Sequence, residues 1–194
     1  GLYDQAKEMG LLKTRICQPQ GRIPGADTRL HGVTQQAASS MAPFQEEWEF
    51  FAQLRESGVL AAHHAPFEQR LLSSIWPHPR ARPDPLAPGS LIQRWGPWID
   101  TLCLYKRYFP NLPSYSLRNL VQYFHLQGLL EQTAAHYVTS SRRRYHCAPY
   151  DALATGLLVG YLLEHFPGLK EFSTLCLHSQ RIAPEDPTPY LPLF

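Results

Sequence analysis

The sequence predicts a single α/β domain over residues 1–194, and three observations support this prediction. Apolar residues make up 44% of the chain and charged residues 18%, which is typical of a globular protein. At 194 residues, the chain is also long enough to bury a sizeable core. Short strand-like runs are followed by segments in which apolar residues recur at steps of three and four. Strands that alternate with helices indicate an α/β layer architecture.

Three strands are expected in this alternation. Residues 11–17 alternate and end at a turn-rich stretch, residues 59–62 form a short buried apolar run, and a strand beginning at residue 98 turns into a helix. Further helices are expected at residues 43–55, 67–75, 116–125 and 149–165. The last of them is the longest and the most apolar.

Two proline-rich stretches interrupt the pattern. Residues 77–97 are expected to form an irregular surface excursion within the domain, and the tail from about residue 184 to lie over the surface. Trp95 and Trp98 border the first stretch. We expect them to pack under the loop, although aromatic rings at such a place can also stack on bases.

Composition excludes several classes of protein. The sequence has no glycine-rich phosphate loop of the GxGxxG or GKS/GKT kind, and no apolar run long enough to span a bilayer. Its four cysteines are far apart and lack zinc-site spacing, which favours reduced thiols in a cytoplasmic protein. The net charge of +2 neither demands nor excludes a nucleic-acid partner.

Glu68 follows the predicted strand 59–62 and falls in the first turn of the next helix. In open α/β sheets, ligands bind beyond the carboxyl ends of strands, which makes this carboxylate a candidate site residue. An acidic residue is also favoured in the first turn of any helix by the helix dipole. Taken alone, the segment favours this second interpretation.

His146 and Asp151 form a second candidate, at the start of the apolar helix 149–165. A carboxylate on such a helix needs a partner, because burying an unpaired charge is costly. A divalent metal is one such partner, and a nearby imidazole is suited to serve as a general base toward water. A capping aspartate beside a surface histidine explains the same residues, and the two interpretations remain open. The remaining candidate segment, residues 23–34, has the composition of a turn.

Four segments in order resemble the DEDDh branch of the DnaQ-like exonucleases, the group that includes the proofreading epsilon subunit of bacterial DNA polymerase III. IPGADTRLHGVT resembles the family's loop ending in HGIT, and VLAAHHAPFEQRLL resembles its second motif, HNxxFD. WIDTLCLYKRYFPNLPSYSLRNL resembles its D-T-L element with the Ser-Tyr-Ser-Leu helix start, and YHCAPYDALAT resembles its third motif. The resemblance covers roughly residues 11–165.

The resemblance implies a ribonuclease H-like mixed sheet flanked by helices. It also implies stepwise removal of nucleoside monophosphates from the 3′ end of single-stranded or frayed DNA or RNA, with two Mg²⁺ or Mn²⁺ ions. His146 matches the family's general base, Asp151 its metal-binding aspartate, and Glu68 takes the place of its second-motif aspartate. A DNA polymerase or another protein is a further partner that the resemblance suggests.

Several residues match positions near the substrate. The residues expected beside the 3′-terminal nucleotide are His31, Val33, His63, His64 and Phe67. Arg142, Arg143 and Arg144 directly precede His146 and are suited to gripping flanking phosphates, although charge runs are more often solvated loops.

The family's first motif, Asp-x-Glu on the first strand, has no counterpart in the sequence. Ahead of the HGVT segment the acidic residues are Asp4, Glu8 and Asp27, and none stands in that arrangement. Glu68 and His64 also replace the usual Asp and Asn. We therefore expect the natural protein to be longer, and this chain to lack the first strand or strands and to show little or no trimming activity.

The alternative function is a degenerate scaffold of the same fold that binds nucleic acid or a protein partner without cleavage. Retention of His146 with Asp151 favours the exonuclease, whereas loss of Asp-x-Glu favours the scaffold.

Overall fold

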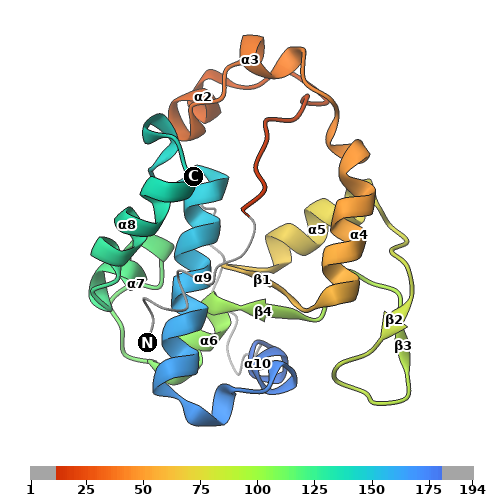
Figure 1. The fold of residues 1–194 in the computed structure, drawn as a ribbon, viewed down its shortest axis with the longest axis vertical. Helices are drawn as coiled ribbons and strands as arrows, with labels where there is room; N and C mark the ends of the chain where they lie inside the picture. Colours follow the sequence, from red (N-terminus) through yellow and green to blue (C-terminus); the bar gives the residue numbers. More distant parts are fainter. Residues whose placement is uncertain (1–11, 181–194) are drawn as a thin grey trace.

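The computed structural model describes residues 12–180 and has a mixed α/β architecture (Figure 1). Helices account for about 55% of it, and the sheet is small. The predicted α/β class is therefore confirmed.

Most of the chain folds into helices joined by short connections. The α-helices are α2 (Gly25–His31), α3 (Gln35–Ser39), α4 (Trp48–Ser57), α5 (Pro66–Ile75), α6 (Thr101–Tyr108), α7 (Leu117–Tyr123), α8 (Gln127–Tyr137), α9 (Ala148–His165) and α10 (Phe172–His178). The 3₁₀ turns are η1 (Phe44–Glu47), η2 (Ser140–Arg142) and η3 (Pro167–Leu169). The strands are β1 (Leu60–Ala62), β2 (Arg82–Pro83), β3 (Leu91–Ile92) and β4 (Trp98–Asp100).

β1 and β4 form a two-stranded parallel sheet in which Ala61 is paired with Ile99. α10 packs against β4, and the backbone N–H of Asp100 donates to Ser179 Oγ at 2.9 Å. β1 has no second strand partner among residues 12–180, and Ala61 is exposed. One edge of the small sheet is thus covered by a helix, whereas the edge of β1 has no strand partner within residues 12–180.

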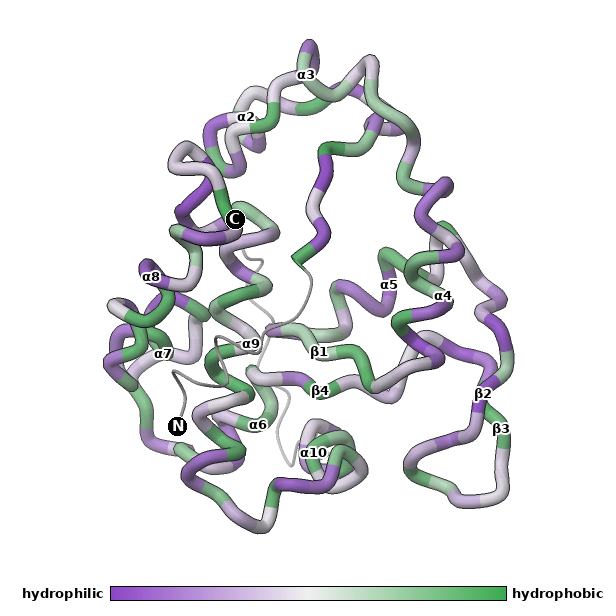
Figure 2. Tube along the Cα trace, viewed as in Figure 1, coloured by the Kyte–Doolittle hydropathy of each residue, from purple (hydrophilic) through white to green (hydrophobic). Residues whose placement is uncertain are grey.

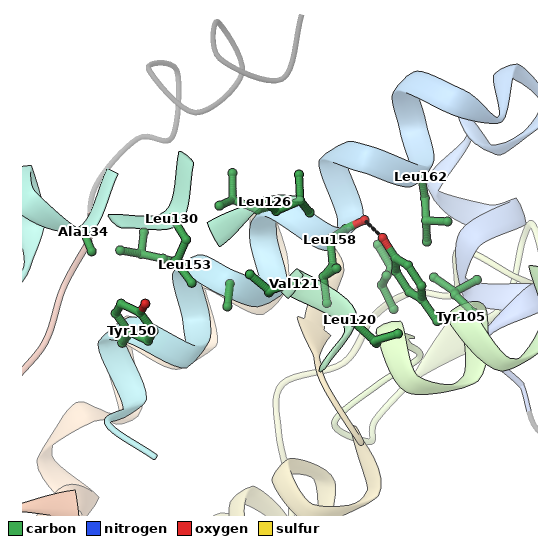
Figure 3. Close-up of a cluster of buried hydrophobic side chains, with 14 of the residues drawn as sticks. Tyr105, Leu120, Val121, Leu126, Leu130, Ala134, Tyr150, Leu153, Leu158 and Leu162 are labelled. Carbon is green, nitrogen blue, oxygen red and sulfur yellow. Dashed lines mark hydrogen bonds between the residues drawn. The ribbon is translucent and has the colours of Figure 1, made fainter. Parts of the chain in front are cut away.

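The main core surrounds α9, which packs against α7, α8, α6 and β1. Nine of its residues are buried, and Figure 3 shows Leu153, Leu158 and Leu162 among leucines of α7 and α8. The buried Tyr105 hydroxyl donates to the Leu158 carbonyl at 3.0 Å (Figure 3). Each fully buried apolar side chain of this kind stabilises the fold by about 1.5–3 kcal/mol.

The helices with clear apolar periodicity are confirmed close to their predicted bounds. Ser116 caps α7, its hydroxyl accepting from the Asn119 backbone N–H at 3.3 Å, as expected for a serine at this position. The strand expected at 59–62 is shorter, and of its three residues only Ala62 is buried. α8 and α10 were not predicted.

The strand predicted at residues 11–17 is wrong, because residues 12–17 form no strand in the structure. Their side chains are committed to other contacts. Lys13 and Arg15 both pair with the Glu47 carboxylate at 2.5 Å, and Arg15 also donates to the carbonyls of Ala42 and Pro43. Side chain contacts thus replace a strand ladder. Leu11 lies outside the described residues, as does the tail from residue 184.

The turn predicted at residues 23–34 is also wrong, because it contains α2. Gly32 ends this helix in the left-handed region (φ 77°), and its N–H donates to the Thr28 carbonyl at 2.8 Å. Asp27 lies in the first turn and Arg29 in the last, which suits the helix dipole. No residue of α2 is buried, so the sequence carries no apolar periodicity for this helix.

The proline-rich stretch at 77–97 is irregular, as predicted, but includes the antiparallel hairpin β2–β3. Trp95 is fully buried and its indole N–H donates to the Trp76 carbonyl at 2.8 Å, which confirms the expected packing under the loop. Trp98 donates to Gln69 Oε1 at 2.7 Å. The guanidinium of Arg55, on α4, donates to the carbonyls of Arg80, Ile92 and Arg94, so it anchors both ends of the stretch.

Apolar and polar residues are interspersed along most of the chain trace (Figure 2). Within residues 12–180, no helix combines the length and the apolar character needed to cross a membrane.

Candidate functional site

His146 and Asp151 are in direct contact at the start of α9. The backbone N–H of His146 donates to both carboxylate oxygens of Asp151, at 3.3 Å and 3.0 Å. His146 has a positive φ of 68°, which turns its N–H toward the carboxylate while its side chain is exposed. Burial of Asp151 raises the pKa of its carboxyl group to about 6, against the opposing effect of the His146 hydrogen bond. The turn therefore combines an exposed imidazole with a half-buried carboxyl group that titrates near neutral pH.

Two tyrosines, Tyr145 just before His146 and Tyr150 just before Asp151, anchor this turn to α8. The Tyr150 hydroxyl donates to Glu131 Oε1 at 2.5 Å and accepts from Gln127 Nε2 at 2.9 Å. The Tyr145 hydroxyl donates to Gln127 Oε1 at 3.1 Å, and the two tyrosine rings meet edge to face. Because α8 was not predicted, Gln127 and Glu131 were not identified from the sequence. Because α8 has no strong apolar periodicity, the sequence did not indicate that Gln127 and Glu131 hold these tyrosines.

The HGVT segment lies against the same turn. Cys147 Sγ donates to the His31 carbonyl at 3.4 Å, and a Cβ at Gly32 would lie 2.5 Å from a guanidinium nitrogen of Arg144. The Val33 N–H donates to His31 Nδ1 at 3.0 Å, which fixes the imidazole close to its own backbone. The structure thus brings two of the four recognised segments together.

The three arginines that precede Tyr145 have different environments. Arg142 donates to Thr14 Oγ1 at 3.3 Å, and Arg143 Nε donates to the Val138 carbonyl at 2.8 Å. Arg144 is exposed, and its guanidinium makes no hydrogen bond or ion pair with the residues that the structure describes. Arg144 is therefore the arginine of this run that uses none of its donors within the described residues.

The second recognised segment, at the turn from β1 to α5, is fixed by a residue that sequence reasoning did not single out. The buried Asp100 carboxylate accepts the backbone N–H groups of His64, Ala65 and Leu102, each at 3.0 Å. These bonds hold His64 at a positive φ of 69° and orient the start of α5. An aspartate between an apolar strand and a helix is a typical N-cap residue. This position is the signal from which Asp100 could have been identified in the sequence.

The imidazole of His63 is used inside the protein. Its Nδ1 lies 2.9 Å from Thr101 Oγ1, and the ring also hydrogen-bonds the Tyr115 backbone. Burial lowers the pKa of His63, which favours a neutral ring that joins β1 to the loop ahead of α7. The expectation that His63 lies beside a substrate therefore competes with a structural role visible in the fold.

Glu68 and Phe67 lie in the first turn of α5. Burial raises the pKa of the Glu68 carboxyl group, which has no hydrogen bond or ion pair with residues 12–180. The Phe67 side chain is 59% exposed. α9 packs on β1, the strand that precedes α5, and no hydrogen bond or ion pair joins Glu68 to Asp151.

The metal-binding capacity of these carboxylates is limited in the described part of the chain. It contains no group of three or more His, Cys, Asp or Glu side chains arranged to hold an ion. Glu68 and Asp151 have the right chemistry for Mg²⁺ or Mn²⁺, since both present oxygen ligands. By themselves they do not form a site for two ions.

The sequence matches no protein-family model, and no curated protein matches it significantly.

Proposed function

We propose that this chain is a ribonuclease H-like domain whose site at the start of α9 acts on the 3′ ends of nucleic-acid strands. The observation that carries the proposal is the His146–Asp151 turn, in which an exposed imidazole adjoins a half-buried carboxyl group. The HGVT segment packs against this turn, which supports grouping the two segments into one site.

In the proposed reaction, a water molecule attacks the terminal phosphodiester and His146 accepts its proton. The bond from phosphorus to the 3′ oxygen of the preceding nucleotide breaks, and this oxygen takes up a proton from bulk water. The products are a nucleoside 5′-monophosphate and a strand with a new 3′ hydroxyl. Asp151 and Glu68 are the residues proposed to hold Mg²⁺ or Mn²⁺, together with carboxylates beyond those described.

The edge of β1, which pairs with no strand other than β4 among residues 12–180, is where a strand carrying further carboxylates would pair. An unpaired strand edge is a template for another strand, and a two-stranded sheet is marginal alone. We expect the 194-residue chain to bind a single strand and to trim it little or not at all.

The alternative proposal is a scaffold that binds a strand or a protein partner without cleaving it. Among the described residues, no three His, Cys, Asp or Glu side chains are grouped so that they could hold a metal ion, around Glu68 or elsewhere. This favours the scaffold.

A trimming assay distinguishes the two proposals. A 5′-labelled oligonucleotide is incubated with the chain, with and without Mg²⁺, and with a version that carries an Asp-x-Glu strand joined ahead of residue 12. The exonuclease proposal predicts Mg²⁺-dependent shortening by the extended version, which His146→Ala abolishes. If the extended version folds and binds the oligonucleotide but leaves its length unchanged, the scaffold is the correct function.

A further inference from the structure

We propose that Arg118 and Arg144 bind phosphates of one nucleic-acid strand beside the turn that carries His146, an inference that rests on the function proposed above. Arg118 on α7 lies over the ring of Tyr145, and Arg144 lies against Gly32 at the end of α2. Both contacts involve the turn formed by residues 144–147, the first through Tyr145 and the second through Arg144 itself. Arg118 was not among the candidate residues taken from the sequence.

The Arg118 guanidinium is held in place without using its hydrogen-bond donors. Its central carbon lies 5.0 Å from the centre of the Tyr145 ring, within the range of a cation–π contact. Tyr145 is itself fixed by Gln127 and by the edge of Tyr150. Arg118 makes no hydrogen bond or ion pair with the described residues. A cation ordered in advance loses less side-chain entropy on binding, while its donors stay free for phosphate oxygens.

Arg144 is placed by a glycine. A Cβ on Gly32 would lie 2.5 Å from a guanidinium nitrogen of Arg144, so the arginine occupies space that a side chain at residue 32 would take. Arg142 and Arg143 each have one donor engaged, by Thr14 and by the Val138 carbonyl, which restricts their reorientation toward a phosphate more than that of Arg144. Arg143 is therefore a matched control, because it carries the same charge in the same short run.

The acidic groups around this turn are already engaged. Asp151 accepts the His146 N–H, and Glu131 accepts from Tyr150 and Gln127. Neither forms an ion pair with Arg118 or Arg144. Both cations border the same short turn, so one flexible backbone can reach them together. This favours a single strand over a rigid duplex.

The salt dependence of binding tests the inference with the full 194-residue chain. Anisotropy of short 5′-fluorescein oligothymidylate and oligouridylate is titrated over roughly 50–200 mM salt for each variant. Each phosphate contact on a single strand adds about 0.7 to the slope of log affinity against log salt. We therefore expect Arg118→Gln and Arg144→Gln each to reduce the slope by about 0.7, and Arg143→Gln to leave it unchanged.

A second variant tests the platform under Arg118. Tyr145→Leu removes the ring but no positive charge, so we expect weaker binding with most of the slope retained, whereas Tyr145→Phe keeps the ring and should bind more tightly than the leucine variant. Thermal melting by circular dichroism checks that each variant is folded.

The inference is overturned if folded Arg118→Gln binds with the wild-type slope, or if the wild-type chain binds neither oligonucleotide. If binding shows the expected slope changes but the Asp-x-Glu version trims nothing, the strand-binding inference stands and only the catalytic proposal fails.

Discussion

Two helical regions of this protein, α9 with its neighbours and the segment from α2 to α4, are stabilised in different ways. α9 has nine buried residues, and the core around it continues through α6, α7, α8 and α10. α2 has no buried residue, and α3 buries Ala38 alone. In Figure 1, α2 and α3 lie at the end of the molecule farthest from α10.

In the second region, polar contacts join α4 to its neighbours, alongside an aromatic cluster formed by Phe44, Trp48, Phe51, Trp76 and Trp95. Glu47 ties residues 12–17 to the start of α4, and Arg55 ties α4 to the proline-rich stretch. The candidate site lies where the regions meet, because the end of α2 contacts the turn that begins α9. A site at such a boundary depends on both kinds of stabilisation.

The largest effect is expected in the apolar region. Leu158→Ala removes a fully buried side chain and should lower the free energy of unfolding by about 2–5 kcal/mol. Leu30→Ala on α2, where the side chain is 50% exposed, should change it by less than about 0.5 kcal/mol. Urea unfolding followed by circular dichroism measures both. Equal losses of unfolding free energy in the two variants would contradict the view that the two regions are stabilised in different ways.

Arg55→Met tests the polar anchoring of the proline-rich stretch. The substitution leaves the carbonyls of Arg80, Ile92 and Arg94 without their donor, and we expect a loss of about 2–4 kcal/mol. Faster proteolysis within residues 80–94 should accompany it. The control is Arg80→Met, because Arg80 is exposed, pairs with surface glutamates and lies over the Trp48 ring without donating to the stretch. Unchanged proteolysis in the Arg55 variant would show that the aromatic cluster alone holds this stretch.

The raised pKa of Asp151 makes stability depend on pH. The folded pKa of about 6 lies above the ordinary value of 3.8, so the folded state binds the proton more tightly. Stability contributed by the protonated carboxyl group is present below about pH 4 and is lost as pH rises toward 6. After allowance for partial exposure, Asp151→Asn should be more stable than wild type at pH 7 by about 1–2 kcal/mol.

Unfolding measured at pH 4 and at pH 7 for both proteins tests this expectation. The gain at pH 7 should shrink at pH 4, where wild-type Asp151 is largely protonated. A variant that is less stable than wild type at pH 7 would mean that the His146 hydrogen bond outweighs the burial of the charge.

The smallest effect is expected at Glu47. Hydrogen bonds from Lys13 and Arg15 hold the pKa of this carboxyl group below its usual range. Its contribution is therefore present above about pH 4.5 and is lost as pH falls. Glu47→Gln should cost less than about 1 kcal/mol, and less at high salt, because the pairs lie near the surface. A loss independent of salt would point to hydrogen bonding rather than charge.

Where apolar residues are periodic, much of the fold could be predicted from the sequence. Where polar contacts determine the conformation, little of it could be predicted. The helices at 43–55, 67–75 and 149–165 follow from the spacing of their apolar residues. The strand expected at 11–17 is wrong because its side chains bind Glu47 and backbone carbonyls, and alternation alone does not reveal those partners. α2 was missed because none of its residues faces a core.

Local parts of the site were also easier to predict than distant ones. The spacing of His146 and Asp151 puts them in one turn, and the structure joins them by a hydrogen bond. The anchors of that turn, Gln127 and Glu131, come from a helix that had no clear apolar face. The distance between Glu68 and Asp151 depends on how α5 and α9 are arranged, which no local spacing specifies.

The central claim is that the His146–Asp151 turn receives the 3′ end of a strand, and a paramagnetic label tests it without requiring catalysis. A short oligonucleotide carries a nitroxide at its 3′ end or at its 5′ end, and backbone amide signals of the chain are recorded with each. We predict that the 3′ label broadens the signals of His146 and Asp151, and that the 5′ label leaves them sharp. Broadening of these signals by the 5′ label alone, or by neither label when the oligonucleotide is bound, would contradict the claim.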